Sequence, residues 1–193
     1  MGVEYELKFR ADPDSQDAVR QAVAGEETVY DLQTTYYDTP SGAMSGRRYT
    51  LRRRLENAVS VCALKIPEEG AGRGEWEVCC ESIHDAIDRL CQLGAPADLK
   101  ELVAEGIVPV CGAKFTRIAK TVVLEDCTLE LALDRGVLIG GGKEVPLCEI
   151  EVELKAGTRE ACNRYAGMLA AKFHLEQERL SKFRRALALH KGE

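Results

Sequence analysis

The chain has 193 residues, of which 45% are hydrophobic and 30% are charged, and this length suits one domain with a sizeable core. Its formal net charge of −6 comes from 26 basic and 32 acidic side chains, so no basic excess points to a nucleic-acid partner. The N-terminus has no apolar signal region and no segment approaches membrane-spanning length, which predicts a cytoplasmic protein with no membrane partner.

The first third of the chain predicts four strands, one helix and one loop. Alternating apolar and charged residues predict the first strand, and runs of β-branched and aromatic residues predict the others. For the helix, Asp12 can act as cap, Pro13 suits the first turn and Gly25 can end it. In chain order we expect a strand over 3–10, the helix over 12–25, a strand over 28–40, the loop over 41–48, and a hairpin over 48–67 that turns near Glu56-Asn57.

The rest of the chain predicts four more strands and four more helices. Ser82 and Asp85 form a capping pattern for the first of these helices, and Gly94 can end it. The expected strands cover 74–81, 108–125, 127–139 and 143–157, and the expected helices cover 82–94, 98–106, 158–173 and 180–193. Strands that follow one another this directly favour antiparallel pairing. We therefore expect one α+β domain over 1–193, with eight antiparallel strands closed or nearly closed into a barrel and helices packed outside.

Charged residues alternate with apolar residues along most of these strands. Because alternate residues share a face, Glu149, Glu151 and Glu153 form one acidic row, while Arg52 and Arg54 form a basic pair. For any single strand, a half-buried sheet with its charges in water would explain the pattern. For the whole set, rows of like charge need counter-charges, and the apolar stripes of the helices need apolar sheet surface to cover. We therefore expect the charged faces to point into the barrel.

Such a charged interior indicates what the barrel holds. Burying many charges is costly unless they find partners. Carboxylates at this density suit a hard divalent cation with oxygen ligands, whereas arginine and lysine suit phosphate oxygens. Acids and bases in one cavity therefore indicate a complex of a metal ion with a polyphosphate.

The same residues resemble the CYTH superfamily, also called triphosphate tunnel metalloenzymes. Glu4-Tyr5-Glu6-Leu7-Lys8 resembles the opening E-x-E-x-K signature of that family. Further matches follow in order over nearly the whole chain: Tyr36-Tyr37-Asp38-Thr39, Leu51-Arg52-Arg53-Arg54, Ala63-Leu64-Lys65, Glu75-Trp76-Glu77, Arg117, a turn at Leu133-Asp134-Arg135-Gly136, Glu149-Ile150-Glu151-Val152-Glu153-Leu154 and Leu180-Ser181-Lys182. The resemblance implies an eight-stranded antiparallel tunnel barrel that binds a triphosphate with Mg²⁺ or Mn²⁺.

The resemblance also implies a role for each matching residue. Metal would be held by Glu4, Glu6, Glu149 and Glu151, with Glu153 as a further candidate on the same face. Phosphate oxygens would be bound by Lys8, Arg52, Arg54, Lys65, Arg117 and Lys182, with Arg73 as a further candidate. Glu75, Glu77 and Asp134 would orient water, metal or basic side chains, and the residues expected to act in catalysis are Lys8, Arg52, Arg54, Glu75, Glu77 and Asp134.

The expected activity is metal-dependent hydrolysis of a small-molecule triphosphate, as in bacterial inorganic triphosphatase domains, which the late strand and the Ser181-Lys182 ending resemble most. Inorganic triphosphate ranks first because every distinctive residue addresses phosphate or metal. The alternatives are a class IV adenylate cyclase making cyclic AMP, a thiamine triphosphatase, and a sensor that binds nucleotide or polyphosphate without turnover. Trp76 argues against thiamine, because strand parity turns it away from Glu75 and Glu77. The protein itself would be a monomer or a homodimer.

The eight cysteines show no C-x-x-C pair and no zinc spacing with the three histidines. Most lie in apolar runs, where free cysteine behaves as a small hydrophobic side chain. We therefore expect packed, reduced thiols rather than a disulfide framework or a covalent nucleophile.

Overall fold

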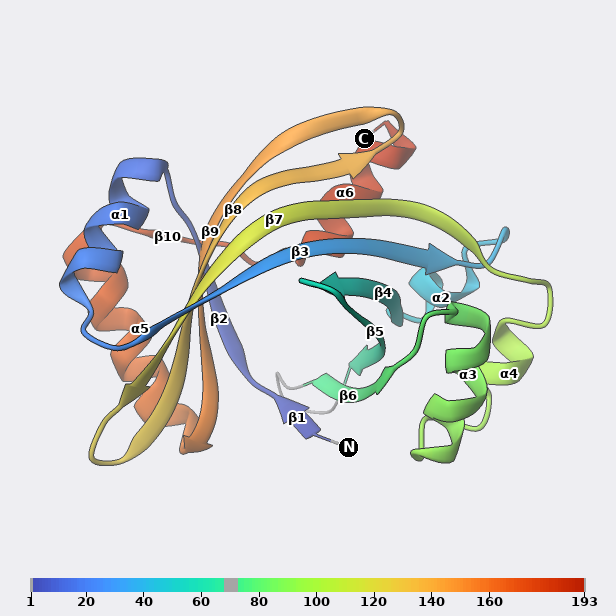
Figure 1. Ribbon diagram of the computed structural model, residues 1–193, viewed down its shortest axis with the longest axis horizontal. Coiled ribbons are helices and arrows are strands. Elements are labelled where there is room, and N and C mark those ends of the chain that lie inside the picture. The colour runs from blue at the N-terminus through green and yellow to red at the C-terminus, as the bar shows by residue number, and fades with distance from the viewer. Residues whose placement is uncertain (1, 68–72, 193) are drawn as a thin grey trace.

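A computed structural model describes residues 2–67 and 73–192, with side chains from Glu4 onward. In this part of the chain, ten strands form one antiparallel sheet that six helices accompany (Figure 1). The strands are β1 (Gly2–Glu4), β2 (Glu6–Arg10), β3 (Glu27–Asp38), β4 (Thr50–Glu56), β5 (Val59–Pro67), β6 (Arg73–Cys79), β7 (Val108–Val123), β8 (Cys127–Gly140), β9 (Lys143–Gly157) and β10 (Glu176–Gln177). The helices are α1 (Pro13–Ala22), α2 (Ala43–Gly46), α3 (Ile83–Gln92), α4 (Leu99–Leu102), α5 (Arg159–Phe173) and α6 (Lys182–Lys191). None of the described helices is both long and apolar enough to cross a membrane.

The four longer helices predicted from the sequence are present. Their N-cap side chains each accept a hydrogen bond from the backbone N–H three residues on, and these caps are Asp12, Ser82, Thr158 and Ser181. The first helix, α1, ends before Gly25, and α4 is shorter than the helix expected over 98–106. The expected loop over 41–48 contains the single turn α2, because the Asp38 carboxylate accepts backbone hydrogen bonds from Met44 and Ser45.

The first strand is split into two parts at Tyr5. Its first part, β1, pairs with β6, whereas β2 pairs with β9, and the Tyr5 carbonyl accepts a hydrogen bond from the Leu154 N–H at 2.9 Å. The strand order is therefore β1-β6-β5-β4-β3-β7-β8-β9-β2-β10, and its hydrogen bonding is not closed. The predicted large antiparallel sheet with helices is confirmed, but its closure into a barrel is not: the described part has ten strands rather than eight, in an open order whose far-apart members β1 and β2 are joined through Tyr5.

All the remaining pairings are antiparallel, and most follow chain order; the exceptions are β3 with β7, which joins the two halves of the sheet, and β2 with β10. β3, β4, β5 and β6 pair in sequence, and so do β7, β8 and β9. The segment Leu133-Asp134-Arg135-Gly136, expected as a turn, lies inside β8. Its register places Asp134 opposite Arg117 on one side and opposite Glu149 on the other, so three charged residues of one face become neighbours.

Two apolar clusters cover the outer face of the sheet. In one, Phe9, Leu131 and Ile150 pack against α1 and α5, with Tyr5 and Leu7 beside them. This confirms the predicted outward direction of the apolar residues of the first strand, except for Val3, whose side chain lies outside the described residues. A second cluster packs β4, β5 and β6 against α3 and α4; its members include Leu51, Cys62, Leu64, Trp76, Ile87, Leu90 and Leu99.

A third apolar cluster lies on the inner face and involves α6. Phe183 and Ala186 of α6 pack against Phe115, Leu138 and Leu147, which share strand faces with charged interior residues. The expectation that all helices pack outside is therefore wrong for α6. The apolar side of α6 fills one part of the interior and confines the charged residues to the rest.

All eight cysteines are free, as predicted from the absence of paired spacings. Cys62 and Cys111 are buried, and burial raises the pKa of their thiols to about 11 and about 12. Both thiols therefore stay protonated near neutral pH, which makes them packing groups and poor nucleophiles.

Gly136 lies where β7 and β8 approach each other closely, so a substitution at this residue tests that packing. A Cβ at this position would overlap the Lys114 carbonyl oxygen and the Phe115 backbone. We predict that Gly136→Ala lowers the free energy of unfolding by about 1–3 kcal/mol, measured by urea denaturation. Gly167→Ala is the control, because a Cβ there meets nothing within 4 Å, and it should raise stability by about 0.4–1 kcal/mol. Equal stability of the two variants would contradict this packing.

Candidate active site

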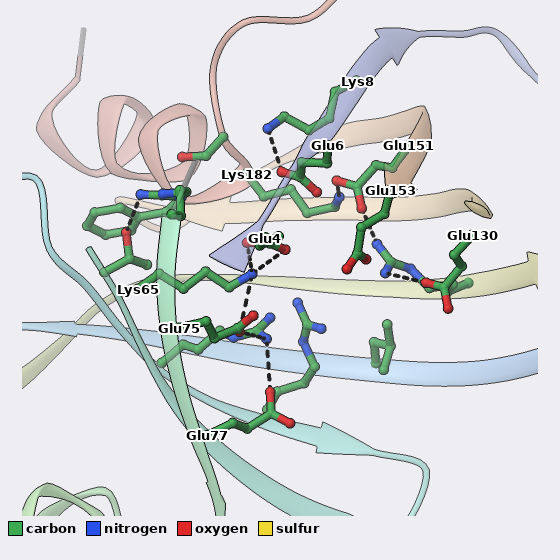
Figure 2. A pocket seen from close by; sticks show the side chains of 18 of the residues that line it. Glu4, Glu6, Lys8, Lys65, Glu75, Glu77, Glu130, Glu151, Glu153 and Lys182 are labelled. Atoms are coloured by element: carbon green, nitrogen blue, oxygen red, sulfur yellow. Dashed lines mark hydrogen bonds and ion pairs between the residues drawn. The ribbon is translucent and has the colours of Figure 1, made fainter. Parts of the chain in front are cut away.

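Strands β1 through β9 and the start of α6 line a cavity of about 350 Å³ inside the sheet (Figure 2). Its described lining contains equal numbers of acidic and basic side chains. The acids are Glu4, Glu6, Glu56, Glu75, Glu77, Glu130, Glu151 and Glu153, and the bases are Lys8, Arg52, Arg54, Lys65, Arg73, Arg117, Lys155 and Lys182. The charged strand faces thus point inward, as periodicity predicted. Of the residues selected from sequence, only Asp134 and Glu149 are not part of this lining.

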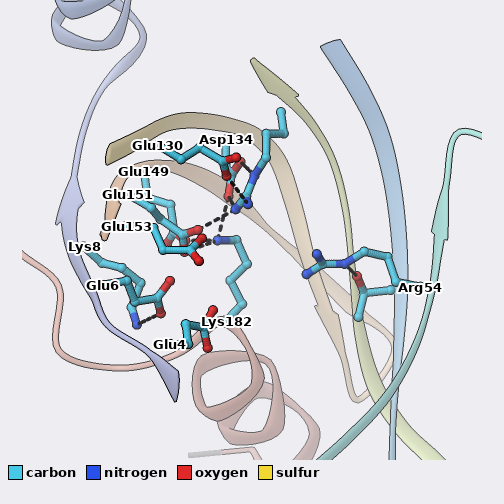
Figure 3. Close-up of polar contacts among 12 residues, drawn as sticks. Glu4, Glu6, Lys8, Arg54, Glu130, Asp134, Glu149, Glu151, Glu153 and Lys182 are labelled. Carbon is cyan, nitrogen blue, oxygen red and sulfur yellow. Dashed lines mark hydrogen bonds and ion pairs between the residues drawn. The ribbon is translucent and has the colours of Figure 1, made fainter. Parts of the chain in front are cut away.

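Lys182 lies at the centre of a buried charge cluster (Figure 3). Its Nζ is 2.7 Å from the Asp134 carboxylate and 2.8 Å from Glu151, and it also contacts Glu149. Arg117 donates two hydrogen bonds of 2.7 Å to Asp134 and one of 2.5 Å to Glu151. Asp134 and Glu149 are fully buried, so this cluster forms the wall behind the cavity.

The pKa values in this cluster follow from burial and charge together. Burial alone would lower the pKa of the Lys182 ammonium, but Asp134, Glu151 and Glu149 raise it well above its usual value. Burial would likewise raise the pKa of Glu151, but Lys182 and Arg117 hold it well below the usual range. For Glu149, burial raises the pKa to about 7 against the attraction of Lys182. Lys182 therefore stays charged, and the cluster depends on it.

Oxygen atoms of Asp134, Glu149 and Glu151 lie within 4.8 Å of one another, a spacing that could hold a metal ion. The Lys182 ammonium contacts all three carboxylates, and Arg185 contacts Glu149 as well. A metal ion in this cluster would have to compete with these cations. The carboxylates of Glu4 and Glu6 are not part of the cluster, so among the described residues the four principal predicted metal ligands do not share one centre.

Three further carboxylates of the cavity, those of Glu4, Glu6 and Glu153, are each paired with one lysine. Glu4 accepts from Lys65 at 2.7 Å, and Lys65 also lies 3.3 Å from Glu75. In addition, Lys8 pairs with Glu6 at 2.9 Å, and Lys155 pairs with Glu153 at 2.8 Å. These pairs line the cavity surface, so both members can exchange partners when a ligand carries charges of both signs.

The arginines of β4 and β6 are the least compensated cations of the cavity. Arg52 lies 3.4 Å from Glu75 and 3.6 Å from Glu77, and its buried Nε finds no hydrogen-bond partner among the residues that the structure describes. Arg54 donates to Thr34 at 3.1 Å, and its nearest carboxylate, Glu56, is 3.6 Å away.

Within the described part of the chain, the Arg73 side chain donates to Thr50 at 3.4 Å, and no carboxylate lies within ion-pair distance of it. Burial and the neighbouring Arg52 lower the pKa of Arg54 to about 10, so it is still charged at neutral pH. This side of the cavity therefore offers guanidinium groups to an anion.

Several residues of the site were not selected from the sequence. Glu130 and Lys155 line the cavity, and strand parity could have found them, because they lie an even number of residues from Asp134 and Glu153. Arg185, which holds Glu149 from behind, follows Lys182 by three residues, a helical spacing. Trp76 packs in the outer cluster with α3, as strand parity predicted.

Lys182 is the group on which the buried cluster depends. We predict that Lys182→Met lowers the free energy of unfolding by about 3–5 kcal/mol at neutral pH, because three buried carboxylates lose their shared cation. Lys172→Met, an exposed site on α5, should change it by less than about 0.5 kcal/mol.

The loss in free energy of unfolding caused by Lys182→Met should also depend on pH. Without the ammonium, the carboxylate pKa values rise in the folded protein above their unfolded values, so the folded state binds more protons and gains stability as pH falls. Urea denaturation at pH 7 and pH 5 measures this. A variant as stable as the parent at pH 7, or one that loses further stability at pH 5, would contradict the role of Lys182.

Comparison with known proteins places this arrangement in a family. An inorganic triphosphatase of Haemophilus influenzae is 28% identical over 130 residues, which are 65% of this chain and 36% of that relative. A protein from Hippeastrum, described as an adenylyl cyclase candidate with a dominant triphosphatase activity, superposes with a TM-score of 0.67 at 19% identity, covering 100% of this chain and 97% of that one. A Pyrococcus horikoshii protein superposes with a TM-score of 0.63 at 22% identity, covering 95% and 98%. A CYTH domain model matches residues 2–187, and the chain therefore belongs to the CYTH domain family.

Proposed function

We propose that the protein hydrolyses a linear triphosphate, bound in the charged cavity together with a divalent cation. The observation that carries the proposal is the lining of eight acidic and eight basic described side chains around one cavity. A metal–triphosphate complex offers positive charge to the acids and negative charge to the bases. The names of the Haemophilus and Hippeastrum proteins agree with this activity, although the chain spans only 36% of the former.

The carboxylates on the cavity surface suit Mg²⁺ or Mn²⁺, which prefer oxygen ligands. Glu4, Glu6, Glu151 and Glu153 line the cavity and would hold the ion. When bound, such an ion polarises phosphoryl oxygens and lowers the pKa of a bound water. Glu149, also predicted as a ligand, lies behind the cavity against Lys182 and Arg185, and we propose that it positions Lys182.

The basic residues would hold the triphosphate in line for attack by water. Arg52, Arg54 and Arg73 are the least compensated, so they would take the phosphate oxygens first. Lys8 and Lys65 would turn from Glu6 and Glu4 to phosphate as those carboxylates turn to the metal. Catalysis then rests on positioning and on charges that are already in place.

The acids near the arginines would orient both the arginines and water. Glu75 contacts Arg52 and Lys65, and Glu77 contacts Arg52. Burial raises the pKa of the Glu77 carboxyl, which makes it a better proton acceptor than an ordinary glutamate. Asp134 is fully buried and bound to Arg117 and Lys182, so it would act by orienting these two cations.

The proposal predicts phosphate release from inorganic triphosphate with Mg²⁺ or Mn²⁺, and no release when a chelator removes the ion. The assay should compare inorganic triphosphate, ATP and thiamine triphosphate at matched free metal concentration, with cyclic AMP measured in parallel. We expect inorganic triphosphate to have the highest kcat/KM. Absence of turnover with every substrate would leave the sensor alternative, and cyclic AMP formation would favour the cyclase.

Arg54 and Arg53 form a matched pair of variants for testing whether the arginines of the cavity bind phosphate. They are neighbours on β4 but lie on opposite faces, and Arg53 pairs outside the cavity with Ser60 and Glu81. Arg54→Ala should weaken triphosphate binding by about 10–100-fold, because a charge-assisted hydrogen bond contributes about 1.5–3 kcal/mol. Arg53→Ala should leave KM within about twofold. Similar KM values for the two variants would place the phosphates elsewhere.

A further inference from the structure

Gln16 is a buried polar side chain of α1, the helix that packs on the outer face of β8 and β9 (Figure 1). Only 3% of its surface is exposed, and the neighbouring residue on this side of the helix, Val19, belongs to the apolar cluster that contains Leu133 and Ile150. A buried amide is costly unless its donors and its acceptor find partners. The partners of the Gln16 amide therefore show what this residue holds.

The Gln16 amide joins two neighbouring strands. Its Nε2 donates to the backbone carbonyl oxygen of Asp134 on β8 at 3.0 Å and to that of Glu149 on β9 at 3.1 Å. Asp134 and Glu149 lie opposite each other in the register of these strands. Both hydrogens of the amide nitrogen are thereby used. The amide thus ties together the two backbone positions that carry fully buried carboxylates.

The carboxylates of these two residues lie on the opposite face of the sheet, where both contact the Lys182 ammonium (Figure 3). A side chain moves with its own backbone, so a tie between the two carbonyl groups also fixes the spacing of the two carboxylates. The ammonium needs this spacing to contact both of them. A hydrogen bond on the outer face of the sheet therefore supports the geometry of the inner face.

Arg135 holds the Gln16 amide in this orientation. Its Nε donates to Gln16 Oε1 at 2.9 Å, and its Nη2 donates to the Pro13 carbonyl at 3.1 Å and to the Asp17 carboxylate at 2.8 Å. A guanidinium has donors and no acceptor, so the amide oxygen has to face Arg135. The amide nitrogen then has to face the two carbonyl groups, and the hydrogen-bond partners at both ends fix which way the amide points.

We propose that Gln16 is a positioning residue, which acts from the outer face of the sheet through Asp134 and Glu149 to place the Lys182 ammonium in the cavity. This inference rests on the proposed triphosphatase function and concerns the same site. Lys182 lines the cavity, so a shift of its ammonium changes its distance to a bound phosphate. Gln16 itself is not part of the described cavity lining, so it acts only through the residues that it holds.

The alternative is that Gln16 does no more than anchor α1. Lys120 has such an anchoring role near the other end of the helix, because its buried Nζ donates to the carbonyl oxygens of Arg20 and Val23 at 2.6 and 2.8 Å. Within the described part of the chain, Lys120 does not line the cavity. Removal of its ammonium therefore loosens α1 without affecting the tie between Asp134 and Glu149, which makes Lys120→Met a matched control.

The first measurement needs no substrate. It compares Gln16→Met, which keeps the length of the side chain but removes the amide, with Lys120→Met. The observable is the nitrogen–proton NMR signal of the Lys182 ammonium, assigned by its loss in Lys182→Arg. We expect the ammonium hydrogens to exchange with solvent at least about tenfold faster in Gln16→Met, and within about twofold of the parent rate in Lys120→Met.

The second measurement is turnover of inorganic triphosphate with Mg²⁺. In Gln16→Met we expect kcat to fall about tenfold with KM within about threefold, because Lys182 keeps its charge but loses its position. Lys120→Met should keep kcat within about twofold. Arg135→Met should also lower kcat, and the double variant Gln16→Met/Arg135→Met should be no slower than Gln16→Met alone, because both residues act through one contact.

An unchanged Lys182 signal in Gln16→Met, or equal changes in Gln16→Met and Lys120→Met, would overturn the proposal in favour of simple anchoring. Additive losses of kcat for Gln16 and Arg135 would contradict their shared contact. If Gln16→Met does not fold, Arg135→Met decides, and an exchange rate of the Lys182 hydrogens within about twofold of the parent would then overturn the proposal. If the parent hydrolyses no triphosphate but Gln16→Met alone alters the Lys182 signal, the proposed function fails while the positioning of Lys182 by Gln16 stands.

Discussion

The buried ammonium of Lys182, held among Asp134, Glu149 and Glu151, is the interaction on which the interior of this protein depends. It joins α6 to β8 and β9 and divides the space inside the sheet into an apolar part and a charged part. A lysine at the first residue of a helix is unfavourable for the helix dipole, and three buried carboxylates are unfavourable by themselves. The ammonium offsets the cost of burying the carboxylates, and the carboxylates offset the cost of placing a lysine at the start of the helix. The fold and the site therefore require the same contact.

The cavity beside the Lys182 cluster has charges that are already paired with one another. Lysines and glutamates on its surface form ion pairs at 2.7 to 2.9 Å, whereas the arginines of β4 and β6 have only distant carboxylates or none among the described residues. A metal–triphosphate complex can enter by exchanging partners, with each glutamate turning to metal and each lysine to phosphate. Charges that are already oriented need little reorganisation, which is how a polar site stabilises a transition state.

Many of the strands and helices, and the charged face of the sheet, were predictable from strand and helix periodicity. Alternation along 127–139 and 143–157 predicted β8 and β9 and their charged faces, and the capping residues Asp12 and Ser82 predicted where α1 and α3 begin. The change of partner at Tyr5 was not predictable, because it depends on strands distant in sequence. Nor could an apolar stripe tell which face of the sheet α6 covers. For the same reason parity placed Glu149 beside Glu151 but could not show that α6 puts Glu149 behind the cavity wall.

The central claim is that the cavity charges exchange partners with a metal–triphosphate complex while Lys182 stays bound to Asp134 and Glu149. A crystal structure with Mn²⁺ and a non-hydrolysable triphosphate analogue tests this most directly, because the anomalous signal locates the ion. We predict the ion on carboxylates of the cavity surface, including Glu6, with the phosphates on Arg52 and Arg54 and with Lys182 still bound to Asp134. An ion among Asp134, Glu149 and Glu151 with Lys182 displaced, or an analogue bound outside the cavity, would contradict the claim.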